Sequence, residues 1–273
     1  MSPDQSNWPE LRSPRDVRKI EQAARVAWLA AREAVRAARA GMTTADLDGV
    51  VRSVISRHGG QPAFEQLKSD GAHSPFQGAA CICVNEQALH APPGERVLAG
   101  GDLVTVDVGV VVGGWYGDVA ESGIVPGGLS SATALLRAAR ATVAAGVRAC
   151  GPGVRWSEVA RAVRSAAARH DLTVLSGFTG HGVGRRLHEP PTAGYETRPG
   201  GAEDFLLLPG MVLTIEPILA GLPGKVQIVP DGWTVSTADG SPACHVERMV
   251  HVTRTGRSVL GRASGGRRER EGL

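Results

Sequence analysis

Two apolar stretches of equal length, separated by two glycines, form the clearest pattern in the chain. β-Branched and small residues fill 103–112 and 115–124, and Gly113-Gly114 stands between them. A Gly-Gly step between such runs is typical of a β-hairpin, because glycine adopts positive φ at no steric cost. The pattern therefore predicts two paired strands over these ranges.

Apolar residues recur at helical spacing in four other segments, which come as two pairs. The first pair covers about 14–40 and 44–58, and the second covers about 130–147 and 156–170. A stretch rich in strands and glycines follows each pair. This repetition favours a diverged internal duplication in which two helix pairs back a sheet, although any two amphipathic helix pairs look alike.

Each strand of the predicted hairpin carries one acid among apolar or small residues, Asp107 in the first and Asp118 in the second. An ionised carboxylate inside an apolar strand is costly unless a positive group meets it. One such residue alone is more simply a turn residue or a salt-bridge partner. Two on paired strands suggest a shared cation.

Three later segments also place an acid or a histidine among apolar residues or glycines. His181 lies in Gly-His-Gly-Val-Gly, Glu216 follows Leu-Thr-Ile, and Glu247 lies in an apolar run over 244–252 that we interpret as one strand. Four carboxylates and one imidazole suit a pair of divalent ions such as Mn, Fe(II), Co or Zn. Without cations these carboxylates would repel one another and their pKa values would rise.

Composition excludes several other classes of protein. The 273 residues, of which 42% are hydrophobic, can bury a large core. The net charge of +3 comes from arginines interspersed with Ala and Glu, so no specific nucleic-acid partner is expected. The four cysteines lack metal-type spacing and suggest reduced thiols. No signal peptide or membrane-length apolar run is visible, which predicts a cytoplasmic protein with no membrane partner.

The same pattern predicts one domain over 13–260, in halves of about 13–126 and 127–260. Residues 1–12 are polar, and 261–273 consist almost entirely of Gly, Arg, Glu and Ser. Both ends are therefore predicted to be disordered, the second as a basic tail.

The motifs around these residues resemble those of type I methionine aminopeptidases, in the pita-bread metallopeptidase superfamily, over about 14–256. They are an Asp pair with ten residues between, Gly-His-Gly-Val-Gly with a second His seven after the first, Thr-Ile-Glu-Pro, and a final Glu thirty-one after Glu216. The resemblance implies an α+β pita-bread fold, with two pseudo-symmetric α/β halves around a dinuclear metal site. Two related halves agree with the duplication inferred from the helices.

The resemblance also implies a role for each residue at a matching position. The expected metal ligands are Asp107, Asp118, His181, Glu216 and Glu247, of which Asp118 and Glu247 would bridge the two ions. Glu216 would also transfer protons as a metal-activated hydroxide attacks. His188 would contact the scissile carbonyl, and His90 the peptide nitrogen beyond the cut. The methionine pocket is expected to be lined by Phe76, Cys81, Leu187, Trp233 and His73.

The implied activity is removal of the initiator methionine from nascent chains with a small second residue. Peptide N-termini are then the partners, the ribosome is a candidate partner, and a monomer is expected. Several positions depart from the residues usual in the family: His73, Tyr116, Val119, Leu187, His245 and Arg248. These departures leave open a shifted specificity, for Xaa-Pro or pathway-specific peptides. A non-catalytic pita-bread binding protein is the third hypothesis, but none of the five ligands is lost.

Overall fold

The hairpin predicted from the Gly-Gly step is present with the predicted bounds. Strands β4 (Leu103–Val112) and β5 (Trp115–Ile124) pair antiparallel along their whole length. Gly113 and Gly114 turn the chain with φ of +56° and +75°, a region that glycine enters freely. Local turn chemistry was therefore sufficient to set this hairpin.

The computed structural model describes residues 9–68 and 74–262. His73 and most of both predicted disordered ends lie outside these residues. Residues 9–12, however, are described, and Arg12 forms an ion pair with Glu189 while only 6% of its side chain is exposed. A buried charge pair therefore holds Arg12, which lies within the range 1–12 that the sequence predicts to be disordered.

The first half combines two helices with a four-stranded sheet. Its other elements are α1 (Pro14–Ala37), α2 (Thr44–Arg57), β1 (Gln61–Pro62), β2 (Cys81–Val84) and β3 (Gln87–Leu89). In the sheet, β4 lies between β1 and β2 and also pairs with β5. Both helices begin at capping boxes, in which Ser13 and Thr43 exchange hydrogen bonds with an aspartate three residues on.

The second half has a matching helix pair but spreads its strands over three sheets. Its elements are α3 (Thr133–Ala149), α4 (Trp156–Ala168), β6 (Leu172–Val174), β7 (Thr179–Gly182), β8 (Glu189–Gly194), β9 (Val212–Ile215), β10 (Ile218–Gly221), β11 (Val226–Ile228), β12 (Val235–Thr237), β13 (Ala243–His245), β14 (Arg248–Thr253) and β15 (Gly256–Val259). The sheet orders are β15-β14-β9-β7-β8, β13-β10-β6 and β11-β12-β3.

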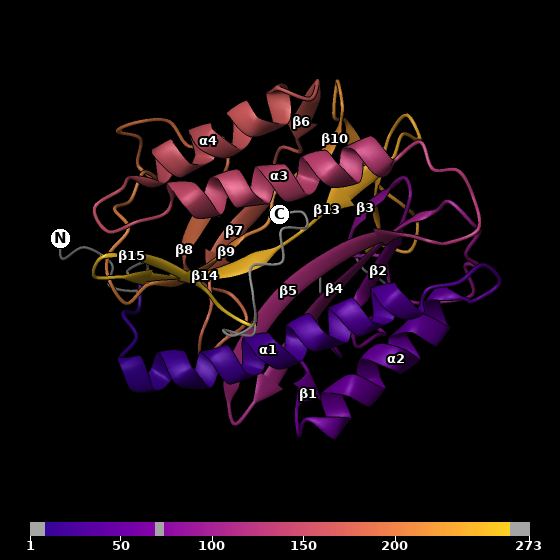
Figure 1. The fold of residues 1–273 in the computed structure, drawn as a ribbon, viewed down its shortest axis with the longest axis horizontal. Coiled ribbons are helices and arrows are strands. Elements are labelled where there is room, and N and C mark those ends of the chain that lie inside the picture. The colour runs from indigo at the N-terminus through magenta and orange to yellow at the C-terminus, as the bar shows by residue number, and fades with distance from the viewer. Residues whose placement is uncertain (1–8, 69–73, 263–273) are drawn as a thin grey trace.

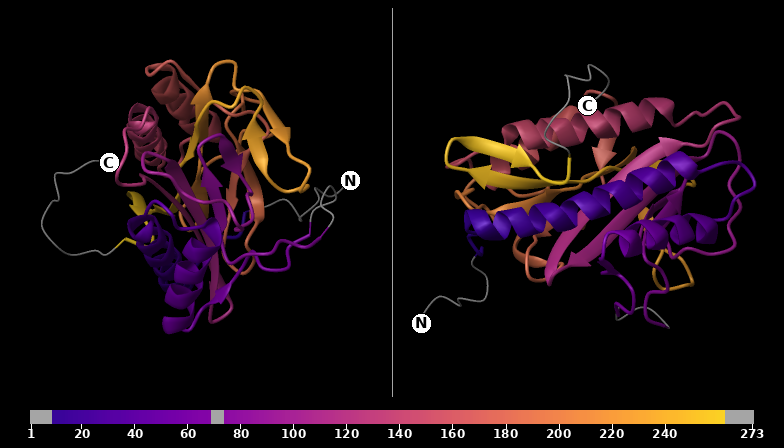
Figure 2. Two further views of the ribbon diagram at one scale, coloured as in Figure 1. Left: turned by 90° about the vertical axis from the view of Figure 1, so that its right-hand side faces the viewer. Right: turned by 60° about the horizontal axis from the view of Figure 1, so that its bottom comes forward.

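The two helix pairs lie toward the same side of the strands (Figure 2), with α1 and α2 on the first half and α3 and α4 on the second (Figure 1). Where the halves meet, β14 contacts β5. One apolar core is built from residues 26–125, and another combines Leu103 with residues 132–252. The boundary expected between the halves near residue 126 stays a prediction.

Helix α1 packs directly on the hairpin. The face of α1 that contacts the strands is rich in buried alanines, among them Ala23 and Ala24. A Cβ added to Gly117 in β5 would lie only 2.3–2.4 Å from backbone atoms of these two alanines. Glycine is therefore required at the position before Asp118, and the close helix fixes this part of the strand.

The prediction of a single strand over 244–252 is wrong. β13 pairs with β10, whereas β14 pairs with β9 in a different sheet, and Glu247 lies between the two strands. The backbone N–H of Glu247 donates instead to Ala120 O of β5 at 3.0 Å. A continuous apolar pattern cannot show such a change of sheet, since both strands contribute buried apolar residues. Among helices within the described ranges, none combines the length and apolarity that a membrane crossing requires.

Candidate metal centre

Five predicted ligands converge from both halves of the chain. Asp107 and Asp118 come from the hairpin, His181 from β7, Glu216 from the residue after β9, and Glu247 from the junction of β13 and β14. Their ligand atoms form groups lying within 4.8 Å of one another: Asp107 with Asp118 and Glu247, and His181 with Glu216 and Glu247. Asp118 also groups with His181 and His188.

The register of the hairpin explains why its two acids share a face. Asp118 pairs with Gly109, two residues beyond Asp107 on β4. Residues two apart point to the same side of a strand, so the two carboxyl groups are diagonal neighbours on one face. Cys81 on β2 is the direct cross-strand partner of Asp107.

Three carboxylate oxygens in this cluster are buried without a hydrogen-bond partner in the part of the chain that the structure describes: Asp107 Oδ1, Asp118 Oδ1 and Glu247 Oε1. The exposed fractions of these residues are 8%, 4% and 2%. A buried carboxylate without a donor or cation is strongly disfavoured. The donor set, four carboxylates and one imidazole, is one that divalent transition metals accept. The residues present therefore fit a divalent metal site.

Burial raises the pKa of every carboxyl group in the cluster. For Asp107 the pKa rises to about 7, and for Glu216 to about 8 with a further contribution from Asp107. Burial also raises the pKa of Asp118 and of Glu247, and the neighbouring carboxylates raise both further. The cluster thus resists holding its full negative charge, and bound cations would remove this penalty.

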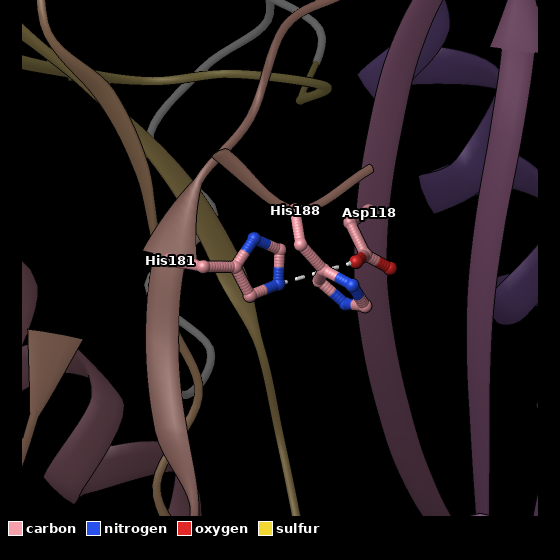
Figure 3. A group of neighbouring side chains, drawn as sticks. All are labelled: Asp118, His181 and His188. Atoms are coloured by element: carbon pink, nitrogen blue, oxygen red, sulfur yellow. Dashed lines mark ion pairs between the residues drawn. The ribbon is translucent and has the colours of Figure 1, made fainter. Parts of the chain in front are cut away.

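His181 presents its Nε2 atom to the carboxylates. This atom lies 3.6 Å from Asp118 Oδ2 and 3.4 Å from Glu216 Oε1, and Figure 3 shows the ring directed at Asp118. On the other side of the ring, Nδ1 lies 2.9 Å from Gly182 O and carries the proton in that contact. Burial, and then His188, lower the pKa of His181 to about 4, so the ring is neutral at pH 7.

Glu216 is held by hydrogen bonds to two other residues. The Thr214 hydroxyl donates to Glu216 Oε1 at 2.5 Å and accepts from the His181 backbone N–H at 2.9 Å. The Glu216 backbone N–H donates to the Tyr195 hydroxyl at 2.7 Å. The sequence analysis did not identify Thr214 or Tyr195. The alternation of β9 places Thr214 on the same face as Glu216, and that signal could have found it.

The two remaining histidines lie near the same cluster. The ring of His188 meets that of His181 edge to face, with centroids 4.4 Å apart. Partial desolvation of the ring, and then His188, lower the pKa of His90 to about 4, although His90 as a whole is exposed. His90 has a left-handed backbone with φ of +57°. It borders a cavity of about 290 Å³ that Trp233 and the strands β11 and β12 also line.

Four of the predicted pocket residues belong to one apolar cluster: Phe76, Cys81, Leu187 and Trp233. The Phe76 ring packs edge to face against Trp233, with centroids 5.2 Å apart. Because Cys81 is opposite Asp107, this cluster directly adjoins the metal ligands. Phe64 and Tyr116 also belong to this cluster, and the sequence analysis did not include them among the expected pocket residues. Because aromatic residues make up only 4% of the chain, each one is a candidate for an apolar pocket, and this signal could have identified Phe64.

Three of the residues that depart from the family pattern, Val119, His245 and Arg248, lie near Glu247 or Asp118 without displacing an expected ligand. Arg248 pairs with Glu121 at 2.7 Å and donates to Ala120 O at 3.2 Å, so it ties β14 to β5. Val119 is packed in the core of the first half. His245 is 1% exposed, and neither ring nitrogen has a partner among the described residues.

Comparison with known proteins gives consistent matches. The model of metallopeptidase family M24 matches residues 18–254. A methionine aminopeptidase of Treponema pallidum is 41% identical over 78% of this chain and 80% of its own. The structure of a methionine aminopeptidase from Thermotoga maritima superposes with a TM-score of 0.86 at 31% identity, covering 94% of this chain and all of that one. A prolidase from Pyrococcus furiosus shares the fold at 21% identity and a TM-score of 0.69, over 93% of this chain and 66% of that one.

Proposed function

The chain belongs to metallopeptidase family M24, and we propose that it is a metal-dependent aminopeptidase that removes N-terminal methionine from peptides and proteins with a small second residue. The pita-bread fold expected from the sequence is confirmed by the structural neighbours. The observation that carries the proposal is the convergence of five ligand residues from both halves, with three buried carboxylate oxygens that lack a partner among the described residues.

Two divalent ions are proposed for this site, with Co, Mn, Fe(II) and Zn as candidates. Asp107, Asp118, His181, Glu216 and Glu247 would hold them, because their oxygen and nitrogen atoms form two groups, each with its members within 4.8 Å of one another. When bound, the ions would polarise the scissile carbonyl and make a water molecule acidic enough to ionise near neutral pH. Their positive charge would also keep the four carboxylates ionised.

Glu216 is the proposed proton acceptor from the attacking water and donor to the leaving amine. Its Oε1 is fixed by the Thr214 hydroxyl, and its backbone by Tyr195, so the carboxylate needs no reorganisation during proton transfer. His188, neutral and beside His181, can donate an N–H to the carbonyl oxygen. His90 can donate to the peptide beyond the cut, since its cavity opens next to Trp233.

The apolar cluster beside Asp107 is the proposed pocket for the methionine side chain. Phe76 is 2% exposed and closes the pocket, and Leu187 and Trp233 supply further apolar wall. An unbranched, polarizable thioether packs well against aromatic rings. Replacing an aromatic by Leu187 changes discrimination by only about 1–3 kcal/mol, so it can broaden the preference without ending turnover. The contribution of His73 stays a prediction.

The alternatives have weaker support. Prolidases share the fold at low identity, whereas the relative at 41% identity is a methionine aminopeptidase. A non-catalytic binding protein would not need five converging ligands. Cytoplasmic location, contact with the ribosome and a monomeric state stay predictions.

The test is release of the N-terminal residue from Met-Ala-Ser, Met-Lys-Ser and an Ala-Pro-Ser control by protein loaded separately with each candidate metal. We expect release from Met-Ala-Ser only, and loss of that release in Glu216→Gln. Preferential cleavage of Ala-Pro-Ser would favour the Xaa-Pro alternative. No cleavage with any metal would overturn the proposed function.

A further inference from the structure

A buried ion pair outside the metal cluster has no part in the function described so far. Arg12 precedes α1, and Glu189 is the first residue of β8, directly after His188. Their side chains are only 6% and 2% exposed, and Arg12 Nη2 donates to Glu189 Oε2. Arg12 also pairs through Nη1 with Glu10, whose side chain is 54% exposed. The pair thus links the start of the chain to the segment that follows a site histidine.

The Glu189 carboxylate organises the loop before it. Its Oε1 accepts from the backbone N–H groups of Arg185 at 2.7 Å and Arg186 at 2.9 Å. Its Oε2 is bound by Arg12. The loop between β7 and β8 is therefore wound around one carboxylate, and this loop carries both Leu187 and His188.

Arg12 is itself rigidly held. Its backbone N–H donates to Gly210 O at 2.8 Å. A Cβ added to Gly184 would lie 2.4–2.8 Å from the Arg12 guanidinium, so the loop closes tightly over it. The loop is also tied to the hairpin, because the Tyr116 backbone N–H donates to Gly184 O at 2.8 Å and Arg185 stacks 4.0 Å from the Trp115 ring.

We propose that Arg12 is a positioning residue, which acts through Glu189 to fix the loop that places His188 and Leu187 beside the metal ligands. The inference rests on the proposed function. His188 lies next in sequence to the carboxylate that Arg12 binds, and its ring already contacts that of His181. A misplacement of about 1 Å in such a group can reduce a rate about 100-fold.

The chemistry of arginine suits this task. Its planar guanidinium is always charged and binds two carboxylates at once, here one exposed and one buried. Removing it leaves the Glu189 carboxylate buried without its cation, which forces the loop to rearrange. Lysine keeps the positive charge but lacks the planar guanidinium that binds two carboxylates at once. Arg12→Lys should therefore retain only part of the positioning effect.

The first experiment is steady-state kinetics of Arg12→Met, Arg12→Lys and Glu10→Gln on Met-Ala-Ser. For Arg12→Met we expect kcat to fall about 10–100-fold, the range for residues that support a metal site, with bound metal unchanged within about twofold and KM raised, because the displaced loop carries Leu187 of the proposed pocket. Arg12→Lys should recover part of the loss. Glu10→Gln, which removes only the exposed partner, should behave like the wild type. An unchanged kcat in Arg12→Met would overturn the inference.

A second experiment separates positioning from charge compensation and does not depend on activity. The double variant Arg12→Met/Glu189→Gln has no buried uncompensated charge, so it should fold. It nevertheless lacks the ion pair that joins the residues before α1 to the loop between β7 and β8. We expect its kcat to stay low, and amide hydrogen exchange of Arg185 and Arg186 to accelerate while α1 and β4 stay protected. Wild-type kcat and protection in the double variant would refute the positioning role. A wild type that cleaves no peptide would refute the proposed function, while the exchange result still tests the tie.

Discussion

The two halves of the molecule supply the candidate metal centre in different ways. The first half contributes Asp107 and Asp118 from one hairpin, whose register is set by neighbouring residues. The second half contributes His181, Glu216 and Glu247 from three segments that meet only in the tertiary structure. The difference shows that one part of the site is fixed by local geometry and the other by the packing of distant strands.

The halves also differ in how their ligands are supported. Thr214 links the second-half ligands, since it binds both Glu216 and the backbone of His181. The hairpin acids have no such support among the described residues, and an oxygen of each is buried without a partner. The hairpin acids and Glu247 therefore depend on bound cations for charge balance, whereas hydrogen bonds already order Glu216 and His181.

The largest effect is expected from the hairpin side. Asp118→Asn removes a charged ligand that faces residues of both halves, so we expect activity to fall by at least about 100- to 1,000-fold, the range for loss of a charge-stabilising group. Metal analysis should show a parallel loss of bound ion. The matched control is Asp239→Asn, an exposed turn residue. Full activity in Asp118→Asn would show that Asp118 is not a ligand.

Removing support on the second-half side should cost less. Thr214→Val keeps the size of a fully buried side chain but leaves Glu216 Oε1 without its donor. We expect kcat to fall about 10–100-fold with metal retained, as for other residues that orient ligands. Thr142→Val is the control, because Thr142 is equally buried and its hydroxyl has no partner in the described chain. Equal kcat in both variants would show that Thr214 does not orient Glu216.

The raised pKa values of Asp107 and Glu216 should make the metal-free protein lose stability from about pH 4 up to about pH 8, and the loss is clearest between pH 7 and pH 8. Burial raises the pKa of Asp107 to about 7 and of Glu216 to about 8, from ordinary values of 3.8 and 4.5. The folded state then keeps protons that the unfolded chain has released, so the free energy of unfolding falls by about 1 kcal/mol per pH unit between pH 7 and pH 8. The buried histidines, whose pKa values are lowered, act only below this window.

Urea unfolding at several pH values, with and without divalent metal, measures this dependence. Metal should raise stability at pH 8 and flatten the slope, since cations replace the missing protons. A metal-free protein that is more stable at pH 8 than at pH 7 would contradict the charge imbalance inferred for the cluster.

The smallest effect concerns the helix starts. Thr43 caps α2 by accepting the N–H of Asp46, whereas α3 begins without a side-chain cap. Thr43→Ala should lower the free energy of unfolding by about 1 kcal/mol, with activity per folded molecule unchanged. Thr133→Ala at the start of α3 should change it by less than about 0.5 kcal/mol, since surface changes usually do. Equal losses in thermal unfolding would show that the halves do not differ here.

Local patterns predicted the first half better than the second. The hairpin strands have the predicted bounds, because turn chemistry and alternation act within a few residues. The break at Glu247 was missed, since a buried apolar run does not reveal which strand it pairs with. The convergence of five ligands followed from their motifs, but the roles of Thr214, Tyr195 and Arg12 required knowledge of which distant segments touch.

The most direct test of a site shared between the halves is a crystal structure of manganese-loaded protein with anomalous scattering. Two peaks about 3.5–4 Å apart are expected, each bound by at least one hairpin acid and one residue of the second half. No peak at the cluster, or peaks bound by residues of one half alone, would contradict the shared dinuclear site.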